Sequence, residues 1–220
     1  MQGLIAHGRG EAFDYILGEQ TIPPALEAER AAAALLKLAE RPVISVNGNT
    51  AALVPRELVE LSKASGAPLE VNLFYRSEER ARRIAELLKA AGAEEVLWKP
   101  ETEIEGLSSE RRKVSKRGIA SADVVFLALE DGDRTEALKR AGKKVIAVDL
   151  NPFSRTALTA DVTIVDNVVR ALPNVIKFLK EMSEEEAKEV ISKFDNERNL
   201  KECVKWIRKW LDLKASELFE

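Results

Sequence analysis

Polar side chains follow two apolar runs in the segment VIAVDLNPFSRTALTADVTIVDN, which covers residues 145–167. Asp149 directly follows the core of the first run, and Asn167 stands just after the second. Arg155 and Thr156 lie between the two runs. Because open α/β sheets bind ligands at the carboxyl ends of their strands, these four side chains form a candidate ligand site.

A second candidate is a four-residue turn between the apolar run VISV, residues 43–46, and a helix predicted over 51–64. The turn consists of Asn47, Gly48, Asn49 and Thr50. Its free backbone N–H groups, at the start of the predicted helix, suit a phosphate, and glycine lets the backbone approach a ligand closely. The turn lacks a Walker lysine and a G-x-G-x-x-G motif, so an ordinary capped turn explains it equally well.

Two further clusters stand near predicted strand ends. Glu70, Asn72 and Arg76 stand near the end of a strand predicted over 67–73. The Arg76 guanidinium can form a fork with a phosphate or a carboxylate, although an ordinary surface arginine is the simpler interpretation.

The second of these clusters is acidic and follows a strand predicted over 122–129. It contains Glu130, Asp131 and Asp133. Because neighbouring carboxylates repel each other, the cluster needs helix N–H groups, Arg134 or Mg²⁺ nearby. Helix capping alone is the competing interpretation, and it leaves the cluster without a metal.

A long polar loop is predicted over residues 98–118, which show no hydrophobic period. Its basic side chains are Arg111, Arg112, Lys113, Lys116 and Arg117. A solvated run of charge is the usual explanation, and a mobile clamp for an anionic substrate is the alternative. Near the start of the chain, HGRGE holds the only histidine, His7, and places Arg9 between two glycines. A lone histidine more often makes a structural hydrogen bond.

Predicted strands alternate with predicted helices through most of the chain, which favours a Rossmann-like, mostly parallel α/β sheet with helices on both faces. Residues 1–182 form this domain. Residues 183–220 form a helical extension whose apolar stripe is predicted to pack on the core or on a second chain. The stripe contains Phe194, Trp206, Ile207, Trp210 and Leu211.

The composition excludes several classes of protein. The 34 basic and 37 acidic residues give a net charge of −3, so long-range attraction to nucleic acid is not indicated. The single cysteine, Cys203, rules out an intrachain disulfide, and no apolar run is long enough to span a membrane. A cytoplasmic enzyme that acts on small molecules fits these limits, with no membrane or nucleic-acid partner.

Seven blocks of the sequence together resemble one known family, the archaeal phosphopantoate–β-alanine ligases, also called phosphopantothenate synthetases. The blocks are GLIAHGRGEAFDY, PVISVNGNTAALVP, EVNLFYR, ERRKVSKRGI, LEDGDRTEAL, DLNPFSRTA and TIVDNVVRALP. They cover the chain from Gly3 to about Pro173, and the C-terminal helices match only loosely. The resemblance implies a homodimeric ligase of coenzyme A synthesis that joins 4-phosphopantoate to β-alanine and converts ATP to AMP and diphosphate.

The resemblance also implies roles for individual residues. ATP is expected at Arg9, Asp149, Leu150, Asn151, Arg155, Thr156, Asn167 and Val168. For the other substrate, the strand-end position, the free N–H groups and the Arg76 charge together place the phosphate of phosphopantoate on the turn. Its expected contacts are Asn47, Gly48, Asn49, Thr50, Glu70, Asn72 and Arg76. The charge of the triphosphate would be neutralised by Mg²⁺, for which Asp131 and Asp133 are candidate ligands, and by the catalytic side chains Arg9, Lys113 and Arg155.

Two departures from the family pattern bear on these expectations. Members usually begin with a further helical segment, which also reaches the nucleotide site, whereas this chain opens close to Arg9. Arg112 stands where a glycine is expected, so the basic loop is expected to be stiffer than usual. A catalytically impaired nucleotide-binding or dimerisation module, and another ATP-dependent α/β enzyme, are therefore the alternative functions.

Overall fold

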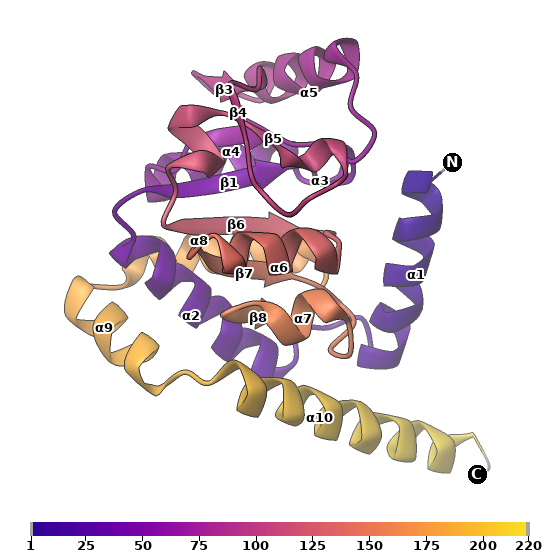
Figure 1. Cartoon of the computed structure of the whole chain (residues 1–220). Coiled ribbons are helices and arrows are strands. Elements are labelled where there is room, and N and C mark those ends of the chain that lie inside the picture. Colours follow the sequence, from indigo (N-terminus) through magenta and orange to yellow (C-terminus); the bar gives the residue numbers. More distant parts are fainter. Residues whose placement is uncertain (1, 219–220) are drawn as a thin grey trace.

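A single parallel sheet forms the centre of the molecule (Figure 1). The computed structural model describes the backbone of residues 2–218 and the side chains of residues 10–218. The sheet has six strands in the order β3-β2-β1-β6-β7-β8. Their bounds are Val96–Leu97, Leu69–Val71, Pro42–Val46, Val124–Ala128, Lys144–Val148 and Val162–Ile164, respectively. The predicted mostly parallel α/β sheet is therefore confirmed.

The two central strands, β1 and β6, are neighbours in space but far apart in the chain. Pro42 is opposite Val124 and Ile44 is opposite Phe126 in this pairing. On one side of the pair the chain continues outward through β2 and β3, and on the other side through β7 and β8. The strand order therefore reverses between β1 and β6, and such a reversal opens a crevice at the carboxyl ends of the strands.

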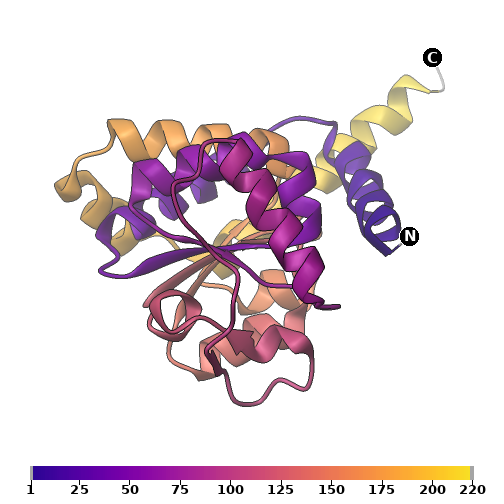
Figure 2. The same ribbon diagram turned by 90° about the horizontal axis from the view of Figure 1, so that it is seen from above.

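Helices cover both faces of the sheet, as Figure 2 shows. One face packs against α2 (Pro23–Leu38), α4 (Pro55–Ser65), α5 (Glu78–Ala90) and α8 (Val168–Glu181). The other face packs against α6 (Gly132–Arg140), α7 (Arg155–Thr159) and the loop before β6. Alternation within a strand produces this division, because Ile44 and Phe126 point to the first face while Val43 and Val125 point to the second.

The helix predicted over 51–64 is wrong in its bounds, because the structure forms two helices there. They are α3 (Gly48–Leu53) and α4, and the break falls at Val54, which has φ −137° and ψ 47°. Proline lacks an N–H group and disfavours helical backbone in the residue before it, so Pro55 ends one helix and begins the next.

The long loop before β6 is more ordered than predicted. It contains β4 (Thr102–Glu103), a 3₁₀ turn (Glu110–Arg112), β5 (Lys113–Val114) and a helical turn (Lys116–Ala120). β4 and β5 pair antiparallel, with Thr102 opposite Val114. Val114 and Ile119 are fully buried beneath the sheet, so the basic loop is packed against the core and is not a free charge run.

Helices at both ends of the chain complete the molecule. The first, α1 (Gln2–Leu17), was not among the predicted helices. At the other end, α9 (Glu184–Lys193) and α10 (Asn196–Glu217) confirm that the predicted extension is helical through its described residues. Leu17 and Ile22 pack with Leu200, Cys203 and Ile207 in one apolar cluster, so the start and end of the chain share a core. Among the described residues, no helix has the length and apolarity needed to cross a bilayer.

Candidate active site at the carboxyl ends of the strands

A narrow cleft of about 20 Å³ opens where α1 and α3 face the ends of β6, β7 and β8, so it must widen to admit a ligand larger than water. It is lined by Gly10, Glu11, Leu53, Leu129, Val148, Leu150, Asp166, Asn167 and Val168. The structure thus brings together Leu150, Asn167 and Val168, three of the residues predicted to bind a nucleotide. Arg9 precedes Gly10 in α1, but its side chain lies outside the described residues, as does that of His7.

Asp149 shapes the turn that follows β7. Its Oδ1 accepts a hydrogen bond from the Asn151 N–H at 2.9 Å, and its Oδ2 accepts one from the Ser154 hydroxyl at 2.5 Å. Ser154 in turn accepts a hydrogen bond from the Ala157 N–H at 2.9 Å, which caps α7. Burial raises the pKa of the Asp149 carboxyl. The side chain therefore fixes the turn that carries Arg155 and Thr156.

The guanidinium of Arg155 lies above the start of α6. It pairs with Asp133 Oδ1 at 2.7 Å and, more weakly, with Glu136 at 3.6 Å. These ion pairs are exposed, with 61% of the Arg155 side chain and 70% of the Asp133 side chain accessible to solvent, so the arginine can exchange partners at little cost. A Cβ atom at Gly132 would lie 2.5 Å from the Arg155 Cβ, so only glycine allows this close approach of α6 and α7.

An ion-pair network fixes Asn167 at the end of β8. Asp14, from α1, accepts a hydrogen bond from Asn167 Nδ2 at 2.8 Å and pairs with the Arg170 guanidinium at 2.5 Å. Arg170 also pairs with Asp166 at 2.6 Å. Asp166 accepts a further hydrogen bond from the Thr21 hydroxyl at 2.5 Å. The network thereby docks α1 against the same strand end that lines the cleft.

Asn47 spans the crevice between β1 and β6. Its Nδ2 donates to the carbonyl oxygens of Ala128, at 2.8 Å, and Leu129, at 3.2 Å. Leu129 has φ +55°, a left-handed conformation that a branched side chain rarely adopts. Strained residues of this kind concentrate at functional sites, where the surrounding contacts hold them in place.

The turn after β1 uses its own side chains to satisfy its backbone. The Oδ1 atom of Asn47 accepts hydrogen bonds from the N–H groups of Asn49, at 2.9 Å, and Thr50, at 3.1 Å. The Thr50 hydroxyl reaches back to the Asn47 N–H, which completes a capping box. Two of the N–H groups that were predicted to bind a phosphate here therefore already have an acceptor.

Two polar side chains of β2 and its end hold the basic loop. Glu70 accepts hydrogen bonds from the N–H groups of Ser115, at 2.8 Å, and Ile119, at 2.6 Å, and burial raises its pKa. Asn72 Nδ2 donates to the carbonyl oxygens of Arg111 and Lys113, both at 3.1 Å. The structure therefore engages these two predicted substrate-binding residues with the protein's own backbone.

Arg76 faces a separate hollow of about 390 Å³ beside the ends of β2 and β3. The hollow is lined by Arg76, Ser77, Glu78, Trp98, Lys99, Pro100, Glu110 and Lys113. Arg76 donates to the Val71 carbonyl at 3.4 Å and to that of Trp98. Lys113 pairs with Glu110 at 2.8 Å. Three cations, Arg76, Lys99 and Lys113, outnumber the two glutamates, Glu78 and Glu110, around this hollow. The excess of positive charge favours an anion.

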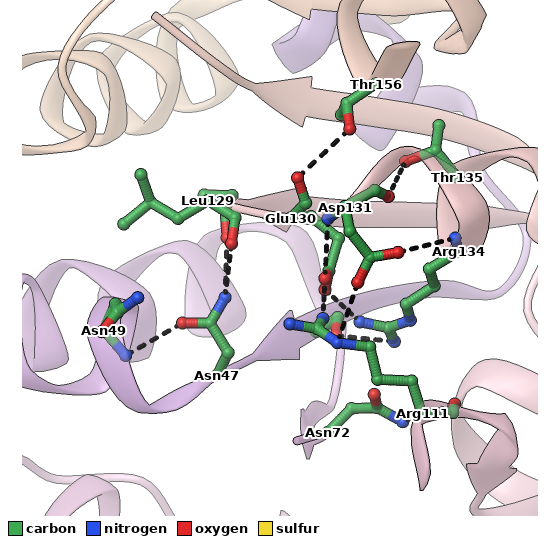
Figure 3. Close-up of polar contacts among 12 residues, drawn as sticks. Asn47, Asn49, Asn72, Arg111, Leu129, Glu130, Asp131, Arg134, Thr135 and Thr156 are labelled. Carbon is green, nitrogen blue, oxygen red and sulfur yellow. Dashed lines mark hydrogen bonds and ion pairs between the residues drawn. The ribbon is translucent and has the colours of Figure 1, made fainter. Parts of the chain in front are cut away.

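A buried ion network occupies the crevice itself (Figure 3). Glu130 pairs with both Arg111 and Arg134, and the Arg134 guanidinium also donates to the Ser45 hydroxyl at 2.9 Å. Asp131 caps α6 by accepting from the Arg134 N–H at 2.9 Å. Burial lowers the pKa of Arg111 to about 9, with the Arg134 charge contributing, and burial lowers that of Arg134 to about 10. Both remain charged at neutral pH.

The predicted partners of the acidic cluster are thus found in part. The Arg134 guanidinium pairs with Glu130, and the backbone N–H of Arg134, at the start of α6, donates to Asp131, as the sequence indicated. Asp131 and Asp133 do not form a protein-based Mg²⁺ site, because one pairs with Arg111 and caps α6 while the other pairs with Arg155. Across the described residues, no three His, Cys, Asp or Glu side chains converge as metal ligands.

Sequence reasoning missed several residues of this region: Asp14, Ser45, Leu129 and Arg170. Asp14 and Arg170 carried no local signal, since they are 156 residues apart and meet only when α1 docks. Leu129 was the last residue of the strand predicted over 122–129, and leucine as a residue type does not indicate a left-handed backbone. Arg111 was assigned to a solvated or mobile loop, whereas its side chain is 9% exposed.

Comparisons with known proteins agree on one family. A family model described as phosphopantothenate/pantothenate synthetase matches residues 24–210. The chain is 56% identical to a 4-phosphopantoate–β-alanine ligase of Thermococcus kodakarensis, an alignment that covers 98% of this chain and 84% of that protein. The ligase of the same name from Methanosarcina mazei is 54% identical, with 99% and 87% covered. That of Methanospirillum hungatei is 48% identical, with 96% and 86% covered.

Proposed function

The chain belongs to the phosphopantothenate/pantothenate synthetase family. From this premise we propose which strand ends bind ATP and which bind phosphopantoate. The protein is a 4-phosphopantoate–β-alanine ligase, which makes 4'-phosphopantothenate for coenzyme A synthesis. The observation that carries this assignment is 48–56% identity, over nearly the whole chain, to ligases of that name.

ATP binds in the cleft at the ends of β6, β7 and β8. The nucleotide contacts are Arg9, Asp149, Leu150, Asn151, Arg155, Thr156, Asn167 and Val168. The cleft supports this assignment, because Leu150, Asn167 and Val168 line it and Gly10 places α1 at its rim. Arg155 is available for phosphate, since its present partners are exposed carboxylates. The triphosphate oxygens would hold Mg²⁺, whose charge would offset that of the phosphates.

Phosphopantoate binds on the other side of the crevice. Its phosphate lies in the hollow lined by Arg76, Lys99 and Lys113, where full positive charges are available. The turn Asn47-Gly48-Asn49-Thr50 forms the wall towards the nucleotide. Glu70 and Asn72 act through the loop that they hold, because their hydrogen bonds fix the backbone at Lys113 and Ser115.

The reaction proceeds by adenylation and then amide formation. The phosphopantoate carboxylate attacks the α-phosphorus of ATP and pyrophosphate leaves; the β-alanine amine then attacks the acyl carbon, and AMP leaves. Arg9, Arg155 and Lys113 neutralise the charge that the phosphoryl groups carry, so positioning and electrostatic stabilisation supply the rate enhancement. The scheme uses no thiol nucleophile. Cys203 is buried in the apolar cluster that it forms with Leu17, Ile22, Leu200 and Ile207, and burial raises its pKa to about 12.

A product assay tests the proposed function. AMP should form only when ATP, phosphopantoate and β-alanine are all present, and the amount of phosphopantothenate should equal the amount of AMP. Formation of ADP instead, or formation of AMP that does not depend on β-alanine, would overturn the proposed reaction.

We propose further that the enzyme is a cytoplasmic homodimer. Phe74, Tyr75 and Phe153 are exposed by 44%, 56% and 59%, and aromatic side chains are enriched at interfaces between chains. Sedimentation equilibrium should give twice the monomer mass of 24.4 kDa. A monomer at micromolar concentration would contradict this part of the proposal.

A further inference from the structure

Buried polar atoms that lack a hydrogen-bond partner gather in the crevice between β1 and β6. Among the described side chains, seven buried nitrogen or oxygen atoms have no such partner. Five of the seven belong to Asn72, Arg111, Asp131 and Arg134. Native proteins satisfy nearly all buried polar groups, so a concentration of exceptions at strand ends indicates a place that a ligand completes.

The unsatisfied atoms are of both kinds. Asn72 Oδ1 and Asp131 Oδ2 are acceptors, whereas Arg111 Nε, Arg111 Nη1 and Arg134 Nε are donors. Arg111 Nη1 is in an ion pair with Glu130, so Asn72 Oδ1 and Arg134 Nε are the two atoms of this set with neither a hydrogen bond nor an ion pair. Figure 3 shows these side chains converging from β2, the basic loop and α6. Arg111 Nε lies 3.2 Å from Asp131 Oδ2 and forms an ion pair, but the direction of its N–H does not meet the requirement for a hydrogen bond.

We propose that this cluster is the β-alanine subsite, with the β-alanine carboxylate on Arg111 and its ammonium group on Asp131 and Asn72. The proposal rests on the proposed function and deepens it. The dipolar substrate would separate Arg111 from Asp131, whose ion pair is poorly directed. Two well-directed ion pairs would replace it, one between Arg111 and the substrate carboxylate and one between Asp131 and the substrate ammonium group. Asn72 Oδ1 would gain the donor that it lacks.

The charge of the cluster selects a dipolar ligand. Arg111 and Arg134 contribute two positive charges, and Glu130 and Asp131 contribute two negative charges, so the cluster is neutral overall. An anion such as ATP or phosphopantoate gains little from a neutral cluster and finds an excess of positive charge elsewhere, in the hollow lined by Arg76, Lys99 and Lys113. A zwitterion finds complementary charge at both of its ends.

Access and position agree with this assignment. The Asp131 side chain is 34% exposed, whereas those of Glu130 and Arg134 are 1% exposed, so a ligand reaches the cluster from the Asp131 side over a fixed ionic base. The cluster also lies between the two other sites. Leu129, in the nucleotide cleft, immediately precedes Glu130, and Asn72 holds the carbonyl of Lys113, in the phosphate hollow. An amine here can reach the acyl group that joins them.

The test separates the two half-reactions. Exchange of labelled pyrophosphate into ATP requires phosphopantoate but not β-alanine, so it reports adenylation alone. Asp131→Asn keeps the oxygen that caps α6 and removes the charge. We expect its KM for β-alanine to rise about ten- to a hundredfold, with the exchange rate unchanged. Arg111→Lys keeps the positive charge but loses the paired N–H donors of the guanidinium, so its KM for β-alanine should also rise with the exchange rate unchanged. Arg112→Lys, on the same loop, is the matched control.

Propylamine, which lacks the carboxylate, supplies a second readout. The wild-type enzyme should prefer β-alanine strongly, and Arg111→Lys should narrow that preference. If both variants keep the wild-type KM for β-alanine, or if they impair exchange and amide formation equally, the cluster is structural and the proposal is overturned. A wild-type enzyme that shows neither exchange nor AMP formation would overturn the proposed function itself.

Discussion

At the scale of single residues, Arg155 offers the most direct test of the nucleotide cleft. Arg155→Ala should weaken ATP binding about ten- to a hundredfold, because a charge-assisted hydrogen bond to phosphate is lost. The melting temperature should change little, since the present partners of Arg155 are exposed. Isothermal titration calorimetry measures the affinity, with the exposed Arg198→Ala as control. Unchanged ATP affinity would place the phosphates elsewhere.

Arg76 tests the phosphate hollow. Arg76→Ala should raise the KM for phosphopantoate about ten- to a hundredfold and leave the KM for ATP nearly unchanged. Unphosphorylated pantoate should be a poor substrate that is insensitive to the change. Steady-state kinetics with both acids decide the matter, and Arg83→Ala, which removes an exposed ion pair with Glu79 on α5, is the control. An equal loss for both acids would show that Arg76 does not bind the phosphate.

Glu29 makes the stability of the protein depend on pH. Burial and the charge of Asp166 raise the pKa of this carboxyl from 4.5 to about 9, while Asn174 and Arg170 oppose the shift. The folded state therefore holds the proton more tightly than the unfolded state. This group's contribution to stability is complete below pH 4.5 and is lost as the pH rises towards 9.

Glu29→Gln should remove this dependence. The variant should unfold at a higher temperature than the wild type at pH 8–9, and the advantage should shrink towards pH 5. Thermal unfolding followed by circular dichroism across this range measures the difference. Parallel pH profiles for the two proteins would show that Glu29 is already ionised in the folded state.

Residue types could predict some of these positions and not others. The strand-end positions of Asp149 and Asn167 were identifiable because Asp149 follows one apolar run and Asn167, after Asp166, follows the other. Parallel strands bring their carboxyl ends to one edge of the sheet. Arg134 was identifiable as a partner for its neighbouring carboxylates. Its bond to Ser45 was not, because 89 residues separate the two and only the pairing of β1 with β6 joins them.

At the scale of elements, the basic loop depends on one glycine. A Cβ atom at Gly118 would fall on the carboxylate of Glu70, which holds the N–H groups of Ser115 and Ile119. Gly118→Ala should therefore cost about 1–3 kcal/mol in the free energy of unfolding. Urea denaturation measures the loss, with Gly66→Ala, at a turn with open space, as a comparison for backbone strain alone.

Hydrogen exchange gives the second readout for the same variant. Amides 115–119 should exchange faster in Gly118→Ala, while those of β7 should be unchanged. Uniform acceleration across the sheet would mean that the glycine supports the whole fold and not the loop. The sequence could not predict this anchor, because the loop has no period and Glu70 was interpreted as a ligand group.

Elements with strong local signals were predicted well, and those that depend on distant contacts were not. Ser77 caps α5 by accepting from the Arg80 N–H at 3.2 Å, and serine is a residue type that favours this position. The helix α1, by contrast, carries several glycines, which disfavour helices, and gains its place from contacts with α10 and from the Asp14–Arg170 pair.

At the scale of the whole molecule, the reversal of strand order divides the sheet into two assemblies. One contains β1, β2 and β3, and the other contains β6, β7 and β8; within each, every strand pairs with its nearest neighbour in the chain. Pairing of β1 with β6 must close a loop of about eighty residues, as the register of Pro42 with Val124 shows. Such closure is entropically costly and slow.

The late pairing of β1 with β6 affects when the folding chain becomes active. Because the proposed ATP cleft lies at the ends of β6, β7 and β8 and the proposed phosphate hollow lies beside β2 and β3, neither half of the sheet can bind the full set of substrates before the halves join. Recovery of phosphopantothenate synthesis after dilution from urea should therefore lag behind recovery of helical circular dichroism. Simultaneous recovery of both signals would mean that the two halves form in a single step. We therefore expect a newly made chain to gain activity only when β1 and β6 have paired.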